Sequence, residues 1–201
     1  MTNPIDFYFD FSSPYGYLAA MQIDALAARH GRSVNWHPLL LGVVFKATGS
    51  RPLTTMPMKG DYFFHDFERS ARFHDIAYQR PPAFPIATQI PARAMLWVRA
   101  TLGDAKAVEF AKAAYRAYFV DGIRIDEAAG VAQVASSLGL DPTALSEAIE
   151  SAPIKAQLRS EVEQAMARGV FGSPFMIVDG ESFWGSDRLD QLEAFLKNGS
   201  I

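Results

Sequence analysis

Two serines near the N-terminus lie where a predicted strand meets a predicted helix. Residues 5–11 alternate between apolar and polar side chains, as a β-strand does, and Ser12, Ser13 and Pro14 follow directly. Ser13 suits the N-cap of a helix and Pro14 its first turn. Free N–H groups and the helix dipole make such a terminus a cradle for an anion, and they would lower the pKa of a thiol placed there. The Ser13 hydroxyl could therefore donate a hydrogen bond to a thiolate from another molecule, although its position alone favours a plain cap.

The end of the chain carries two further candidate segments. Ser173 and Pro174 open a predicted strand, where a proline is tolerated without any function. Residues 185–188, Gly-Ser-Asp-Arg, begin the last predicted helix. Their N–H groups can hold a carboxylate and Asp187 can hold an ammonium, which are the two charges of an amino-acid head group. Taken singly, this segment is explained by helix capping, which is worth about 1 kcal/mol.

The composition excludes several classes of protein. The 201 residues contain no cysteine, so disulfides, thiolate metal sites and redox steps by the protein's own thiol are excluded. A net charge of −3 argues against a nucleic-acid partner. The four histidines show no metal-ligand spacing, and we expect no metal. With no secretory signal and no apolar run long enough to span a membrane, we expect no membrane partner and a cytoplasmic protein.

The order of the predicted elements indicates the fold class. Strands are predicted at 5–11, 34–37, 175–178 and 182–184, and helices from Pro14 to a stop at Gly31 and at 56–79, 91–102, 104–120, 126–139, 142–150, 153–168 and 187–197. Asp179-Gly180 predicts a type I′ hairpin turn. Without the central helices the order is βαβ–αββα, that of thioredoxin. We therefore predict an α/β protein whose thioredoxin-like domain, residues 1–42 and 155–201, is interrupted by an all-helical domain at residues 43–154.

Three segments together resemble one family. Residues 7–19, Phe-Tyr-Phe-Asp-Phe-Ser-Ser-Pro-Tyr-Gly-Tyr-Leu-Ala, look like the opening of 2-hydroxychromene-2-carboxylate isomerases and kappa-class glutathione transferases. Residues 169–175 and 183–189 resemble the closing motifs of the same group. The resemblance runs the full length of the chain. It implies a DsbA-like fold, a homodimer, and glutathione bound between the two domains.

The resemblance also implies roles for the residues at the centre of the site. Ser13 would face the glutathione sulfur. Ser173 would pair its backbone with the cysteinyl part of glutathione, and the peptide bond to Pro174 would be cis. The protein would thus have a thiolate cradle but take its thiol from bound glutathione.

Five further residues receive roles from the resemblance. Ser186 and Asp187 would hold the γ-glutamyl head of glutathione, with Arg188 beside them. Lys59 matches a lysine that approaches a carboxylate of glutathione or substrate. Ser50 stands where relatives tend to have asparagine, so a shorter side chain would make the polar contact from that loop.

The resulting hypothesis is an isomerase of aromatic catabolism. The glutathione thiolate would add to the conjugated enone of ring-opened 2-hydroxychromene-2-carboxylate, the former double bond would rotate, and elimination would give trans-o-hydroxybenzylidenepyruvate. Glutathione would return unchanged, as a cofactor. Lys59 would orient the carboxylate of this small aromatic keto acid, and aromatic side chains would enclose its ring.

Two alternatives from other classes remain open. A kappa-like glutathione transferase or peroxidase would consume glutathione instead of returning it. A thioredoxin-fold protein without catalysis would use Ser13 and Pro174 to bind an extended peptide. A dithiol oxidoreductase is excluded by the absence of cysteine.

Overall fold

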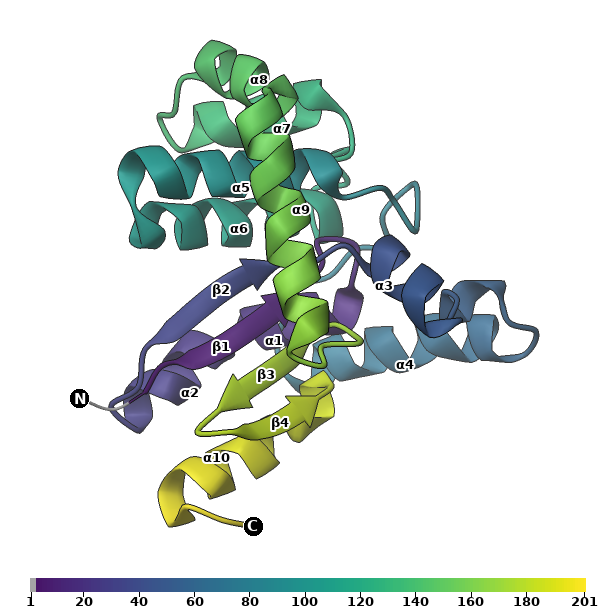
Figure 1. Ribbon diagram of the computed structural model, residues 1–201. Coiled ribbons are helices and arrows are strands. Elements are labelled where there is room, and N and C mark those ends of the chain that lie inside the picture. Colours follow the sequence, from purple (N-terminus) through teal and green to yellow (C-terminus); the bar gives the residue numbers. More distant parts are fainter. Residues whose placement is uncertain (1–2) are drawn as a thin grey trace.

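A four-stranded mixed sheet forms the centre of the computed structural model, which describes residues 3–201 (Figure 1). The strand order is β2-β1-β3-β4. Strands β1 and β2 pair in parallel, and the other two pairs are antiparallel. The strands are β1 (Ile5–Phe9), β2 (Val34–Pro38), β3 (Phe175–Val178) and β4 (Glu181–Trp184). This is the predicted thioredoxin-like order.

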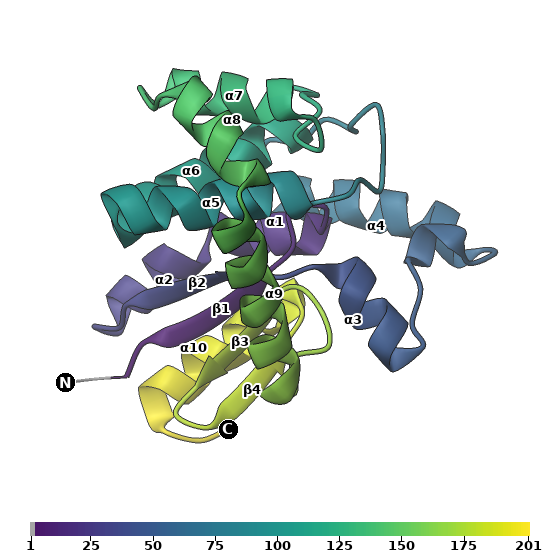
Figure 2. The same cartoon turned by 45° about the horizontal axis from the view of Figure 1, so that its top comes forward.

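Seven of the ten α-helices within residues 3–201 lie in three groups around the sheet. Figures 1 and 2 show α5–α8 stacked beyond one end of the sheet, α3 and α4 extending to one side, and α9 crossing the strands to lead back into β3. The helices are α1 (Pro14–Ala20), α2 (Ile23–Arg29), α3 (Leu41–Thr48), α4 (Lys59–Phe73), α5 (Gln89–Leu102), α6 (Asp104–Phe119), α7 (Ala128–Ser137), α8 (Pro142–Glu150), α9 (Ala152–Ala167) and α10 (Leu189–Asn198), with short 3-10 turns η1 (Leu53–Thr55) and η2 (Ser186–Arg188). Within residues 3–201, none of these helices has the length and apolar character needed to cross a membrane.

Both faces of β1 are covered. Ile5, Phe7 and Phe9 are fully buried on one face, as the alternating pattern predicts. On the other face Tyr8 stacks on His37, with ring centroids 4.7 Å apart. The His37 ring also lies 3.4 Å from the Glu161 carboxylate of α9. Because α9 packs over this second face, β1 is covered on both sides and sets the position of the residues that follow it.

Most element boundaries agree with the sequence-based prediction to within two residues. The hairpin turn is confirmed, since Asp179 and Gly180 both have positive φ, 51° and 87°. The helices predicted from residue 91 onward all form, with small shifts at their ends. The proposed division at residues 42/43 and 154/155 stays a prediction, and its second boundary falls inside α9.

Three predictions about the first half of the chain are wrong in detail. The first strand ends at Phe9 instead of residue 11. The first helix is broken at residues 21–22, because the N–H of Gln22 bonds to Ala19, three residues back, and the α-helical ladder restarts. The helix predicted at 56–79 spans only α4. It starts after Met58, whose φ is 65°, and stops before Asp75, whose φ is 54°.

Helix α3 was not predicted at all. Its N-cap residue, Leu40, has no side chain that can cap, and Gly42 lies in its first turn. The N–H of Leu41 instead donates to the carboxylate of Asp10, 2.8 Å away. A contact across thirty-one residues thus replaces the local cap, which explains why local sequence gave no signal.

Candidate active site

A cavity of about 1150 Å³ opens at the carboxyl end of β1. Its lining comes from the start of α1, from α3 and the loop after it, from one side of α4, and from residues 84–89, 171–174 and 184–187. Six of the eight residues singled out from the sequence contribute to this lining: Ser13, Ser50, Ser173, Pro174, Ser186 and Asp187. The fold therefore brings together two ends of the chain that are 160 residues apart.

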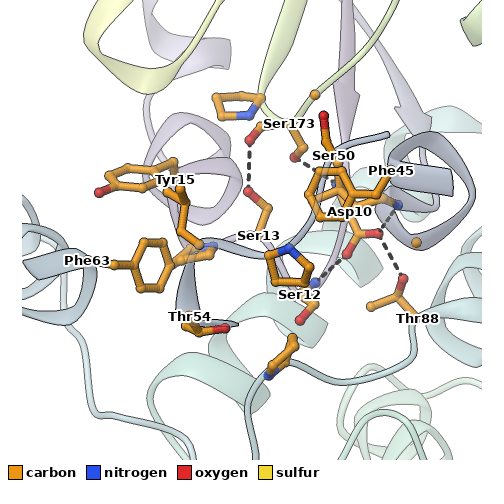
Figure 3. Close-up of a pocket in the computed structure, with 18 of the residues that line it drawn as sticks. Asp10, Ser12, Ser13, Tyr15, Phe45, Ser50, Thr54, Phe63, Thr88 and Ser173 are labelled. Carbon is orange, nitrogen blue, oxygen red and sulfur yellow. Dashed lines mark hydrogen bonds between the residues drawn. The ribbon is translucent and has the colours of Figure 1, made fainter. Parts of the chain in front are cut away.

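Ser13 lies at the centre of the lining (Figure 3). It is buried, and it is the N-cap of α1, as predicted: its Oγ accepts a hydrogen bond from the N–H of Gly16 at 3.0 Å. The same hydroxyl donates to the backbone carbonyl of Ser173 at 2.9 Å. The peptide bond between Ser173 and Pro174 is cis, as the resemblance implied. Ser13 and the cis-proline loop thus face each other directly.

Glycine is required at position 16 for this close approach. A Cβ atom there would lie 2.8 Å from the Ser173 Oγ and 2.8 Å from the Tyr115 hydroxyl oxygen. Both distances are shorter than any normal contact. The absence of a side chain at Gly16 therefore lets α1 pack against the loop that carries the proline.

Asp10 is the functional-site residue that the sequence analysis missed. Its side chain is buried, and three donors surround the carboxylate (Figure 3). Oδ1 accepts from the N–H of Ser12 at 2.7 Å, and Oδ2 accepts from the N–H of Leu41 at 2.8 Å and from the Thr88 hydroxyl at 3.0 Å. Burial raises the pKa of Asp10 to about 6, although the three hydrogen bonds act in the opposite direction.

The backbone of Asp10 is tied to the same site. Its N–H donates to the Ser173 Oγ at 2.9 Å, and its carbonyl accepts from the buried Tyr115 hydroxyl at 2.9 Å. Asp10 therefore joins the start of α1, α3, the segment before α5 and the cis-proline loop. A sequence signal did exist: an aspartate two residues before Ser12 fits an Asx turn, in which the carboxylate accepts from that N–H.

Aromatic side chains form one wall of the cavity. The ring of Tyr15 meets that of Phe63 edge-on at 5.7 Å, and Phe63 lies 5.7 Å from Phe84. The Tyr15 hydroxyl donates to Asp66 at 2.7 Å. Burial and this carboxylate both raise the pKa of Tyr15, so it stays neutral at physiological pH. Such a wall suits a flat, apolar ligand.

The remaining five predicted residues lie at the rim or outside the lining. Ser186 and Asp187 lie in η2, and the Asp187 carboxylate pairs with Arg188 at 3.2 Å. Arg188 itself does not line the cavity, and neither does Lys59, which is exposed as the first residue of α4. Ser50 is exposed and accepts a hydrogen bond from Thr48 at 3.0 Å.

The sheet order, the capping serine of α1 and the facing cis-proline define a thioredoxin-fold protein. The family model described as "DSBA-like thioredoxin domain" matches residues 4–197. The chain therefore belongs to the DsbA-like thioredoxin family.

Individual relatives place the chain in a smaller group within this family. The chain is 35% identical over 198 residues to a 2-hydroxychromene-2-carboxylate isomerase of Sphingobium xenophagum, covering 98% of this chain and 99% of the relative. It is 28% identical over 206 residues to glutathione S-transferase kappa 2 of Caenorhabditis elegans, covering 96% and 91%. A solved 2-hydroxychromene-2-carboxylate isomerase superposes with a TM-score of 0.87 at 28% identity, covering 96% and 94%. The chain thus belongs to the group, identified from its motifs, that contains these isomerases and the kappa-class transferases.

Proposed function

We propose that the protein is a glutathione-dependent isomerase that converts 2-hydroxychromene-2-carboxylate into trans-o-hydroxybenzylidenepyruvate. Similarity to relatives that carry the isomerase name over nearly their whole length supports the reaction. The observation that carries the use of glutathione is the buried Ser13 hydroxyl. It faces the cis-proline loop of a thioredoxin fold that has no cysteine in 201 residues. A thiol at this position must come from a ligand.

The residues of the cavity fit the chemical groups of glutathione. Asp187 offers a carboxylate to the ammonium of the γ-glutamyl head, and Ser186 offers a hydroxyl to its carboxylate. Arg188, paired with Asp187, would hold the Asp187 carboxylate in position. The backbone carbonyl of Ser173, next to Pro174, is an acceptor for the cysteinyl N–H.

The Ser13 hydroxyl would stabilise the thiolate. Its one proton is donated to the Ser173 carbonyl in this structure. A cysteinyl N–H that takes over this carbonyl would free the hydroxyl to rotate toward the sulfur. An unperturbed thiol has a pKa of about 8.5, and each unit by which a donor lowers it corresponds to about 1.4 kcal/mol. We assign the main effect to the hydroxyl, because α1 has only seven residues.

When bound, glutathione supplies the nucleophilic thiolate for reversible addition to the conjugated enone. The chain's own residues orient and enclose the substrate: the wall containing Tyr15, Phe63 and Phe84 would stack against its ring. The neutral Tyr15 hydroxyl already donates its proton to a hydrogen bond with Asp66, so it would not act as an acid toward the substrate.

Other parts of the proposal rest on the resemblance. Lys59 would have to reach the ligand from outside the lining, and the Ser50 hydroxyl would make the contact of the family's asparagine. A homodimer, a cytoplasmic location and a role in the breakdown of aromatic compounds are proposed on the same basis.

A thiol balance tests the proposed reaction. Substrate is incubated with the protein and with a small amount of glutathione, and both product and free thiol are measured. We expect many turnovers per glutathione, with the free thiol unchanged at the end, because elimination restores the cofactor. A reaction that stops when one thiol is consumed for each substrate converted would contradict the proposal.

That contrary result would favour the second candidate, a kappa-type transferase. The specific observation in its favour is the match to a kappa-class transferase over 96% of this chain. Loss of free thiol separates the two, because a transferase leaves glutathione attached to its product. Absence of any glutathione affinity would instead favour the peptide-binding alternative.

A further inference from the structure

The cavity is larger than one small ligand needs. Sites for a single drug-sized ligand typically measure roughly 300–1,000 Å³. The present cavity measures about 1150 Å³ and is lined by residues from η2 to α3 and α4. Besides the polar positions discussed above, it is bounded by apolar residues such as Phe45, Leu53 and Ile86. It therefore has an apolar part that suits a second, largely apolar group.

The acidic side chains that line the cavity already have partners. Asp10 accepts three hydrogen bonds. Asp66 accepts from the Tyr15 hydroxyl and pairs with Arg69, and Asp187 pairs with Arg188. Asp10 and Asp66 are thus held by residues of the chain, and Asp187 is the carboxylate assigned above to the ammonium of glutathione, so none of the three is assigned to a cation in the apolar part.

The lining also contains a positively charged side chain that has no partner within residues 3–201. Arg51 lies in the loop after α3, between Ser50 and Pro52, and lines the cavity. Within residues 3–201 its guanidinium has no hydrogen bond and no ion pair. Among residues 3–201 the lining contains one arginine and no lysine, and a guanidinium is charged throughout the physiological pH range. Arg51 is thus an exposed, permanently positive side chain in the same lining as Leu53 and Phe45, with its hydrogen-bonding capacity unused within residues 3–201.

We propose that Arg51 is the carboxylate anchor of the apolar part of the cavity. A guanidinium binds a carboxylate through two parallel N–H···O bonds, and its apolar surroundings select acids with an apolar body. Two acids of the proposed reaction carry such a group: the glycyl end of glutathione and the 2-oxo acid substrate. The identity of the acid rests on the proposed function, whereas the anchor itself rests on the place of Arg51 in the lining and on its lack of a partner within residues 3–201.

Direct binding measurements with matched ligands test the anchor. The protein, Arg51→Gln, Arg51→Lys and a control, Arg159→Gln, are titrated by tryptophan fluorescence without turnover. Arg159 is an exposed arginine of α9 that does not line the cavity. The ligands are glutathione against its glycinamide form, in which the glycyl carboxylate is an uncharged amide, and trans-o-hydroxybenzylidenepyruvate against the corresponding methyl ketone, which lacks the carboxylate.

We expect Arg51→Gln to weaken binding of one acid by about 10- to 100-fold and to leave binding of the analogue without the tested carboxylate unchanged. Arg51→Lys should recover part of the loss, and Arg159→Gln should bind as the unmodified protein does. A loss confined to glutathione assigns the glycyl carboxylate, and a loss confined to the keto acid assigns the substrate carboxylate.

The proposal would be overturned if Arg51→Gln bound both acids as tightly as the unmodified protein does. It would also be overturned if the variant lost the same affinity for an acid and for its analogue. Both results can be obtained whether or not the protein is an isomerase. An unmodified protein that isomerises while Arg51→Gln binds normally refutes only the anchor. A protein that binds these acids through Arg51 but does not isomerise refutes only the reaction.

Discussion

Replacing Ser13 with alanine is expected to lower the isomerase turnover by about a hundredfold or more while glutathione still binds. The loss of a single donor aimed at a developing or bound anion typically has this size. The backbone contacts to the Ser173 carbonyl and the positions around η2 are untouched by the change, so they should retain the cofactor. The measurements are turnover at saturating glutathione and the dissociation constant of glutathione by calorimetry.

A second readout separates this role from a structural one. The pKa of bound glutathione, followed by the ultraviolet absorbance of its thiolate, should rise in Ser13→Ala because the anion loses its donor. Ser136→Ala, which removes an exposed serine hydroxyl of α7 that donates to Ala132, serves as control and should change neither value. Equal losses of turnover and binding, or an unchanged thiol pKa, would refute the assigned role of Ser13.

Asp10 is expected to make the protein less stable as the pH rises from about 4 to about 6. Burial raises its folded pKa to about 6 from the ordinary 3.8, so in this window the folded state binds more protons than the unfolded state. Unfolding is then favoured by rising pH, and the integrated effect is about 3 kcal/mol. The free energy of unfolding in urea, measured at several pH values, gives the slope.

Asp10→Asn provides the reference that isolates this carboxylate. Both proteins share every other titrating group, and the poorer fit of an amide among the three donors is independent of pH. The stability of the unmodified protein relative to Asp10→Asn should therefore fall by about 2 kcal/mol between pH 4 and pH 7. A difference that stays constant or grows over this range would show that the Asp10 pKa is not raised.

The parts of the fold that were predictable are those set by local sequence. The alternation of residues 5–9 gives β1, and Asp179-Gly180 gives the hairpin because only certain residues accept positive φ at both positions. Ser13 and Pro14 mark the start of α1 for equally local reasons. The contact between Ser13 and Ser173 could be predicted from the thioredoxin-like order of elements, and not from either segment alone.

The parts that were missed depend on distant contacts. Helix α3 is capped by the carboxylate of Asp10, and that carboxylate also binds Thr88, seventy-eight residues away. An alternating pattern assigns Asp10 to the strand's second face but cannot reveal that helices cover that face. Similarly, the sequence offered Lys59 as the cation of the site, whereas the lining contains Arg51. Which lysine or arginine reaches a cavity depends on where loops and helix ends fold.

The central claim is that the reaction uses the sulfur of a bound glutathione at Ser13. The most direct measurement is the rate of 2-hydroxychromene-2-carboxylate isomerisation with no addition, with glutathione, and with S-methylglutathione, which keeps the tripeptide but blocks the thiol. We predict rapid isomerisation with glutathione alone, and inhibition when S-methylglutathione is added to it. Isomerisation at the same rate without glutathione, or with S-methylglutathione in its place, would contradict the claim.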